Sequence, residues 1–210
     1  MGHSQQDKAA SHERILDVAA RQFRKRGFDG VGLAALMDKA GLTLGGFYKH
    51  FTSRDQLVAE AMSHALKNGR VWLQDKVPPD GSAPLGRLLN AYLTPEHRDN
   101  AGNGCAVAAL AVDAARTPAA SADFNAGFRG FADWVGGMLD GPEDEKRARG
   151  GAVICAMAGA IAIARAVDDP RLSDDILKAT RRLIENSQKH KPGAGARRRR
   201  RRPVGRAAKR

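Results

Sequence analysis

The stretch Gly41-Leu42-Thr43-Leu44-Gly45-Gly46-Phe47-Tyr48-Lys49-His50-Phe51 decides the fold of the N-terminal part of this chain. Upstream of it, apolar residues recur at helical spacing from Leu33 to Met37, and the segment ends at Ala40-Gly41, where the glycine is free to adopt a positive φ. Downstream, two phenylalanines stand four residues apart and should face the protein. The pattern predicts two helices that meet across a tight turn, which is a helix-turn-helix.

The second of these helices has the features of a DNA-recognition helix. Thr43 is placed to cap its N-terminus with the hydroxyl, and the positive end of the helix dipole then faces an anion such as a phosphate. Gly45 and Gly46 each cost about 1 kcal/mol relative to alanine, which indicates that the backbone approaches another surface closely. Tyr48 and Lys49 fall on the side away from the protein.

A family resemblance supports this interpretation. The run Gly41-Leu42-Thr43-x-Gly45-Gly46-Phe47-Tyr48-x-His50-Phe51-x-Ser53-Arg54-x-x-Leu57 resembles the signature of TetR-type transcriptional regulators. The preceding Arg21-x-Phe23-x-x-x-Gly27-Phe28 is similar to the first helix of that family, so the resemblance covers roughly residues 11–65. Residues 93–98 and 104–110 resemble one bacterial subgroup of these regulators.

The resemblance implies a set of DNA contacts. They are expected from Thr43, Gly45, Gly46, Tyr48, Lys49, His50 and Arg54. Tyr48, His50 and Arg54 are expected to reach phosphates, and Lys49 to approach a base. Arg54 lies in the first turn of the next helix, against the preference of the helix dipole, and this favours a phosphate partner. Leu44 departs from the family pattern, since a leucine makes only apolar contacts, for instance with a thymine methyl.

The whole chain is predicted to be all-α. Further helices are expected over residues 11–26, 53–72, 85–93, 105–117, 124–138, 143–166 and 173–188, with residues 1–10 frayed and residues 94–104 in a loop. Ser53 and Gln56 form a predicted capping box. We expect a DNA-binding domain over residues 1–56, a helical effector-binding and dimerisation domain over residues 57–190, and an Arg-rich tail over residues 191–210.

The charge of the chain is concentrated in its tail. Of the formal net charge of +12, eleven positive charges lie in residues 189–210, which contain no Asp or Glu, so the rest of the chain carries about +1. The DNA-binding prediction therefore rests on the helix-turn-helix rather than on the overall charge. Six consecutive arginines from Arg197 to Arg202 predict a disordered segment with a salt-sensitive, sequence-independent attraction to DNA, or a merely solubilising extension.

Most aromatic residues lie in the middle of the chain, and either they are core residues or some of them enclose a ligand. The resemblance implies an inducer pocket in this region, with Trp72, Tyr92, Cys105, Phe124, Phe128 and Phe131 as candidate lining residues. Cys105 follows Gly104 at the predicted start of a helix, where unpaired N–H groups would lower the pKa of a thiol and make it reactive; the alternative is a small buried hydrophobe. Cys155 is expected to be inert.

The predicted partners are DNA, a small molecule and a second copy of the chain. Residues 143–166 are rich in small and apolar residues, and residues 173–188 have an apolar face, so the two helices are expected to form a four-helix homodimer interface. They could instead close the core of one monomer. The apolar run over residues 150–164 is too short to span a bilayer, no signal segment is recognised and the cysteines lack ligand spacing, which favours a cytoplasmic protein with reduced thiols.

The expected function is a ligand-responsive transcriptional regulator, by resemblance a repressor. It would bind a palindromic operator as a dimer and be released by a small molecule or an electrophile. No cofactor and no metal are expected, because the six histidines are scattered and no nucleophile elbow, Walker loop or HExxH is present. Two alternatives remain: a DNA-binding protein that senses nothing, and an all-α enzyme in which the cluster Glu96-His97-Arg98 would be catalytic.

Overall fold

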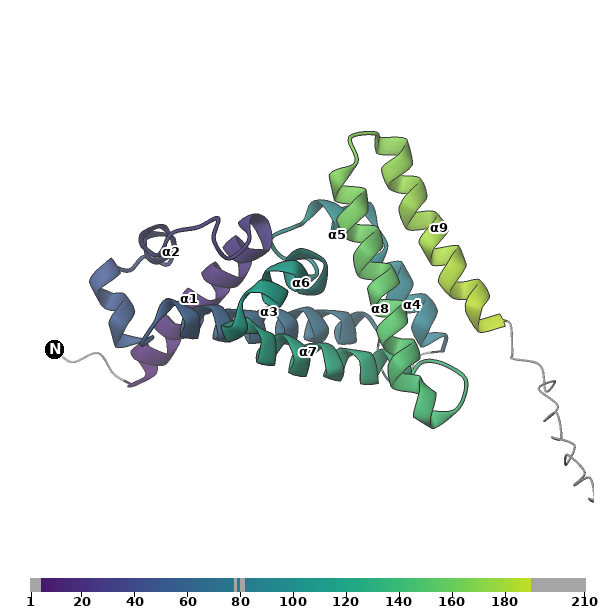
Figure 1. Cartoon of the computed structure of the whole chain (residues 1–210), viewed down its shortest axis with the longest axis horizontal. Helices are drawn as coiled ribbons and strands as arrows, with labels where there is room; N and C mark the ends of the chain where they lie inside the picture. Colours follow the sequence, from purple (N-terminus) through teal and green to yellow (C-terminus); the bar gives the residue numbers. More distant parts are fainter. Residues whose placement is uncertain (1–4, 78, 80–81, 190–210) are drawn as a thin grey trace, which may run out of the picture.

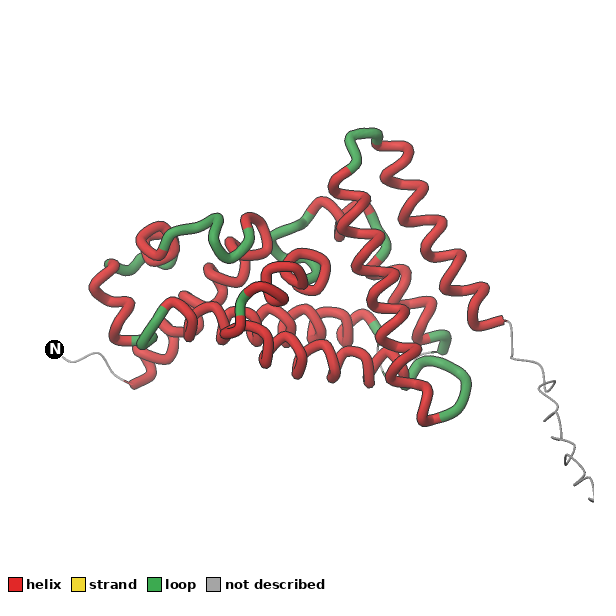
Figure 2. The backbone as a smooth tube through the Cα atoms, viewed as in Figure 1, coloured by secondary structure: helices red, strands yellow, loops and turns green. Residues whose placement is uncertain are grey.

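The computed structural model describes residues 5–77, 79 and 82–189, and within these ranges every regular element is a helix, as predicted. Figures 1 and 2 show the arrangement. In chain order the elements are α1 (Gln5–Arg26), α2 (Leu33–Lys39), the 3₁₀ helix η1 (Leu44–Lys49), α3 (Arg54–Lys76), α4 (Pro84–Tyr92), α5 (Pro95–Asp99), α6 (Ala106–Arg116), α7 (Pro118–Gly136), α8 (Glu143–Ala166) and α9 (Pro170–Lys189).

The helices form an elongated molecule with the helix-turn-helix at one end. α1 and α2 lie at that end, α3 and α7 run side by side along the middle, and α8 and α9 form an antiparallel hairpin at the other end (Figure 1). α6 lies in the middle and packs against α1, α3, α7 and α8. The arrangement places α6 between the helix-turn-helix end and the rest of the chain.

One hydrophobic core holds the N-terminal end together. Helical spacing puts Ile15, Ala19 and Phe23 on one face of α1, and all three are fully buried. This core also draws on the first half of α3 and on α6 and the start of α7, through side chains that include Leu110 and Ala120. The division of the chain at residue 56 therefore stays a prediction, because the packing of the N-terminal core continues across it.

A second core joins the helices of the C-terminal half. It contains Tyr92, Val135, Ile154, Met157 and Ile161, all essentially inaccessible to solvent, along with residues of α9. α7 and α8 approach each other closely where both carry glycine. A Cβ added at position 150 would lie only 2.2 Å from the carbonyl oxygen of Ala132, so any side chain there would separate the two helices.

The structure corrects several predicted boundaries. α1 begins at Gln5 rather than at Ser11, because residues 5–10 are mostly good helix formers and continue the helix by more than a turn. The predicted loop before Cys105 contains the short helix α5, whose first turn is capped by the Thr94 side chain, which accepts a 3.1 Å hydrogen bond from the His97 N–H. The predicted cap of α3 by Ser53 is confirmed, with the Gln56 N–H 3.1 Å from its Oγ.

α8 is, among the described residues, the one helix long and apolar enough to cross a membrane by length and composition. It is longer than the apolar run over residues 150–164 because the acidic turn from Glu143 to Glu145 belongs to it. However, 44% of its most apolar window is buried against other helices, and core helices pass the same test. The predicted Arg-rich tail over residues 191–210 lies outside the described residues.

Candidate functional site

The turn between α2 and η1 has the backbone geometry that the sequence predicted. Gly41 has φ 69°, a left-handed conformation that a side chain would strain. Its N–H donates to the Asp38 carbonyl at 2.9 Å, and the Leu42 N–H donates to the Met37 carbonyl at 2.9 Å. These bonds close the end of α2 and fix the direction in which the chain enters η1.

The predicted recognition helix is the short 3₁₀ helix η1, which is anchored by aromatic packing. The rings of Phe47 and Phe51 are both 1% exposed and stack with their centres 5.4 Å apart. Thr43 occupies the N-cap position as predicted, but its hydroxyl makes no capping hydrogen bond. The predicted hydroxyl cap is therefore not formed, and the Thr43 side chain is exposed at the start of the helix.

The outer side of η1 carries most of the predicted contact residues. Tyr48 is 71% exposed, and Gly45 and Lys49 are also exposed. Leu44 is 47% exposed, so an apolar side chain stands on the same surface. A Cβ added at Gly45 would meet nothing within 4 Å, which leaves the backbone there open to a close approach from outside.

His50 is only half-buried and lies against α1. Its ring centre is 6.0 Å from that of His12, and its Nδ1 is buried without a hydrogen-bond partner. Burial lowers the pKa of His50, and His12, Lys8 and Lys49 lower it further. His50 is therefore neutral at pH 7. Lys8 lies on the N-terminal turns of α1, beside a hollow that Lys49 and His50 also line.

Arg54 does not point outward from α3. Its guanidinium donates through Nη2 to the carbonyl oxygens of Phe28 and Val31, the second at 3.0 Å. Both carbonyls belong to the segment that joins α1 to α2. Two backbone acceptors thus hold the Nη2 end of the guanidinium and tie the start of α3 to that segment, while the phosphate contact of Arg54 stays a prediction.

A small cavity of about 30 Å³ lies where α3, α4, α5, α6 and α7 meet. Four of the predicted pocket residues line it: Trp72, Tyr92, Cys105 and Phe131. Phe124 and Phe128 do not, because they stack on each other along α7 with their ring centres 6.0 Å apart. The sequence did not assign Arg70 and His97 to the pocket, and the structure places both of them in its lining.

The polar groups of this cavity are uncharged apart from Arg70. Burial raises the pKa of Tyr92 well above its ordinary value, and its hydroxyl faces the Cys105 thiol without a hydrogen bond of good geometry. Cys105 is at the N-cap of α6 as predicted, and its Sγ accepts a hydrogen bond from the Ala108 N–H at 3.4 Å. Burial nevertheless raises the pKa of Cys105. The predicted lowering of the thiol pKa is therefore wrong, because desolvation outweighs the helix terminus.

His97 is held in one tautomer beside these groups. Its Nδ1 lies 2.7 Å from the Tyr92 carbonyl oxygen, which can only accept, so this nitrogen carries the proton. Burial lowers the pKa of His97, and the neutral ring then has an unprotonated Nε2. Its ring packs edge-on against Tyr92 at 4.5 Å and is tilted toward Trp72 at 5.6 Å.

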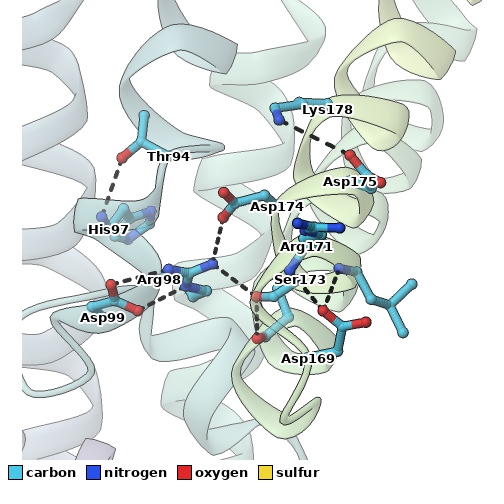
Figure 3. Close-up of polar contacts among 12 residues, drawn as sticks. Thr94, His97, Arg98, Asp99, Asp169, Arg171, Ser173, Asp174, Asp175 and Lys178 are labelled. Atoms are coloured by element: carbon cyan, nitrogen blue, oxygen red, sulfur yellow. Dashed lines mark hydrogen bonds and ion pairs between the residues drawn. The ribbon is translucent and has the colours of Figure 1, made fainter.

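An arginine network links α5 to α8 and α9, and its contacts with α9 are drawn in Figure 3. Arg98 pairs with Asp99 at 2.7 Å and donates to Ser173 and Asp174 on α9, both at 2.8 Å. Arg165 of α8 donates to the carbonyl oxygens of Arg98 at 2.6 Å and of His97 at 3.1 Å. The side chains of His97 and Arg98 in the cluster Glu96-His97-Arg98 thus have structural partners. Within the described residues no group of three His, Cys, Asp or Glu gathers as metal ligands would.

Comparison with known proteins identifies the family. The family model described as bacterial regulatory proteins, tetR family, matches residues 15–61, which run from α1 through η1 into α3. Residues 15–61 of the chain therefore match the TetR family. It is 28% identical over 97 residues to the HTH-type transcriptional repressor KstR2 of Mycolicibacterium smegmatis, and 32% identical over 89 residues to the HTH-type transcriptional regulator AcrR of Shigella flexneri.

The sequence likeness to these TetR-family relatives is confined to part of each chain. The match with KstR2 covers 43% of this chain and 45% of KstR2, and the match with AcrR covers 41% of each chain. This chain therefore spans less than half the length of either relative. The fold likeness extends further. A TetR-family regulator from Cytophaga hutchinsonii has a TM-score of 0.71 at 19% identity, with 91% of this chain and 100% of that chain covered. KstR2 and AcrR are both named as transcriptional regulators.

Proposed function

We propose that this TetR-family protein is a dimeric repressor that binds an operator through two copies of η1 and releases it when a small molecule fills the cavity. The observation that carries the proposal is a direct link between the cavity wall and the helix-turn-helix end. Arg24 of α1 donates from Nε to the carbonyl oxygen of Gly102 at 2.7 Å, and the neighbouring Asn103 and Gly104 line the cavity.

The link supports sensing because any ligand that displaces residues 102–105 must also act on α1. Burial and the nearby Arg21 lower the pKa of Arg24 to about 10, so the guanidinium stays charged at pH 7 and keeps its hydrogen bond. Lys25 of α1 also packs against Gly102. A Cβ added to Gly102 would lie only 2.6 Å from the Cε atom of Lys25. α1 in turn packs against α2 and α3, which position η1.

The proposed DNA contacts are those predicted residues that η1 exposes. Tyr48 and Thr43 would donate to phosphates, Lys49 would approach a base edge, and Gly45 would allow the backbone to lie close to the groove wall. His50 would reach a phosphate only through the edge of its half-buried ring. Arg54 is left out, because backbone carbonyls occupy its guanidinium.

The proposed dimer contact is the outer face of the α8–α9 hairpin, on residues partly different from those expected. Val153, Met157 and Ile161 are buried in the monomer core. The outward face instead carries Ile163, which is 55% exposed, and Leu183, which is 67% exposed. A groove of about 300 Å³ between the two helices is lined by apolar residues, among them Ala152, Ala156, Leu183 and Ile184, and at one end by Arg149, Ser187 and Gln188.

The DNA part is tested with duplexes selected from a random pool by the full-length protein. Tyr48→Ala should weaken binding to every selected duplex by about tenfold, because one phosphate hydrogen bond per protomer is lost. Lys49→Ala should weaken binding and also change the ranking of the sequences, by roughly 1–3 kcal/mol at the contacted base. If affinity and ranking are unchanged in both variants, the proposed docking of η1 is wrong.

A ligand that fills the cavity should release the selected duplex from the wild-type protein. Release should not require Cys105 to react, because the thiol is buried and its pKa is raised. Cys105→Ser should therefore respond to the same reversible ligand. If a compound releases the duplex from the wild-type protein but not from the serine variant, the signal is an electrophile instead. If no compound releases the duplex, a DNA-binding protein that senses nothing is favoured.

A further inference from the structure

The cavity contains one cation that the protein does not neutralise. Arg70 of α3 lines it beside Trp72 and Phe131, and its Nε is buried with no hydrogen-bond partner. The structure records no ion pair for this guanidinium among the described residues. The guanidinium end of Arg70 lies against Gly130 of α7, because a Cβ added to Gly130 would be only 2.6 Å from the Arg70 Nη1 atom. A buried N–H without an acceptor is costly, and in a native structure such a group calls for an explanation, of which an acceptor supplied by a ligand is one.

The surroundings of Arg70 offer no internal counter-ion. None of the residues that line the cavity is an Asp or Glu. The phenol of Tyr92 and the thiol of Cys105 stay protonated because burial raises their pKa values. A second arginine, Arg165, lies close enough to influence both groups, but it is occupied by the carbonyl oxygens of His97 and Arg98. Among the described residues that line the cavity, Arg70 carries the one guanidinium, so this lining is positive and Arg70 is the group that can bind an anion.

We propose that the ligand of this cavity is a small aromatic carboxylic acid, bound as its anion by the Arg70 guanidinium with its ring between Trp72, Tyr92 and Phe131. The inference rests on the proposed function, since it names the chemical class that would fill the sensing site. A planar carboxylate matches the guanidinium in shape and accepts two parallel hydrogen bonds from it. The Tyr92 hydroxyl, buried and without a good partner, is a further donor to the same ligand.

The ligand-free cavity must open for such a molecule to enter. Its volume of about 30 Å³ accommodates one or two waters, whereas a benzene-sized ligand needs a cavity of roughly 150 Å³. Trp72 is 42% exposed and lies at the edge of the cavity, so its indole can swing outward without leaving a buried void. Residues 103–107 also line the cavity, and they follow the Arg24 contact at Gly102. Opening on that side would disturb the link to α1.

The experiment is calorimetric titration of the full-length protein, without DNA, with benzoate and with its neutral analogue benzamide. Benzoate should bind at least about tenfold more tightly than benzamide. Arg70→Met keeps the length of the side chain and removes the charge, and it should weaken benzoate binding by about 10- to 100-fold, the usual effect of losing a hydrogen bond to a charged group. Lys67→Met is the matched control, because Lys67 is an exposed cation one turn earlier on α3 and should not affect benzoate.

The proposal is overturned if benzamide binds as tightly as benzoate, if Arg70→Met and Lys67→Met have equal effects, or if benzoate does not bind at millimolar concentration. The comparison of benzoate with benzamide needs no variant, so it holds even if Arg70→Met folds poorly. A second measurement, of duplex release, tests the sensing function separately from the ligand class. If benzoate binds through Arg70 but does not release the selected duplex, the ligand class stands and the proposed sensing function fails.

Discussion

Arg54→Met distinguishes a structural arginine from a DNA contact at a position where sequence and structure lead to different expectations. The variant keeps an apolar stem of similar length and removes the donors to the carbonyl oxygens of Phe28 and Val31. A hydrogen bond from a charged group contributes about 1.5–3 kcal/mol. Arg54 is only partly buried and water can replace part of this loss, so we expect the free energy of unfolding to fall by about 2 kcal/mol in total.

The assay combines urea unfolding with the salt dependence of DNA binding. For stability, the control is Arg129→Met, since Arg129 is an exposed arginine on α7 for which the structure records no hydrogen bond, and its unfolding free energy should stay within about 0.5 kcal/mol of the wild type. For binding, the logarithm of the affinity is plotted against the logarithm of the salt concentration. A lost phosphate contact reduces this slope by about 0.9, whereas a lost structural hydrogen bond leaves it unchanged.

We therefore expect Arg54→Met to be less stable and to keep the salt slope of the wild type at temperatures where both are folded. Lys49→Ala should show the opposite behaviour, with unaltered stability and a smaller slope, because Lys49 is exposed on η1. A variant at Arg54 with wild-type stability and a slope reduced by about one per protomer would refute the structural role. It would show that the guanidinium leaves the two carbonyls to contact DNA.

Two further predictions concern acid stability and assembly. Burial lowers the pKa of His97 below 6.5, so below about pH 6.5 the unfolded chain takes up a proton that the folded chain does not, and the free energy of unfolding should fall as the pH is lowered. Urea titrations at about pH 7 and pH 5 should show a smaller fall for His97→Gln, and an equal fall would contradict the argument. Leu183→Glu would bury an unpaired carboxylate in the proposed α8–α9 contact and should weaken the dimer by more than about 100-fold. Light scattering at micromolar concentration should then give a monomer mass for this variant but not for the exposed control Arg129→Glu.

The sequence was most informative where structure depends on neighbouring residues. The spacing of apolar residues predicted α1, α2 and α9, the positive φ of Gly41 followed from its position after a helix, and Ser53 capped α3 as expected. These features are decided within one or two turns of chain. The family resemblance, which was carried by residues of the same stretch, was confirmed by the family model over residues 15–61.

The predicted helix boundaries were wrong where the local sequence shows only a weak helical pattern. The helix-forming residues 5–10 are polar and lack the apolar period of the rest of α1, so nothing in the pattern marked them as helical. The five residues of α5 are too few to show a helical period, although Pro95 after Thr94 is a typical helix start. A longer hydrophobic pattern is needed before sequence alone can locate a helix.

The roles of single polar side chains were decided by the tertiary structure. Arg54 finds acceptors 23 and 26 residues earlier in the chain, which no local rule connects to it. Cys105 occupies the predicted helix terminus, yet the sign of its pKa shift follows from how deeply α3, α4 and α7 bury it. The cavity includes Arg70 and His97 and omits Phe124 and Phe128 because the packing angles of these helices, and not their composition, determine which side chains converge. Local periodicity thus determined the helices and the helix-turn-helix, whereas desolvation and pairing of polar groups exist only after distant segments have packed together.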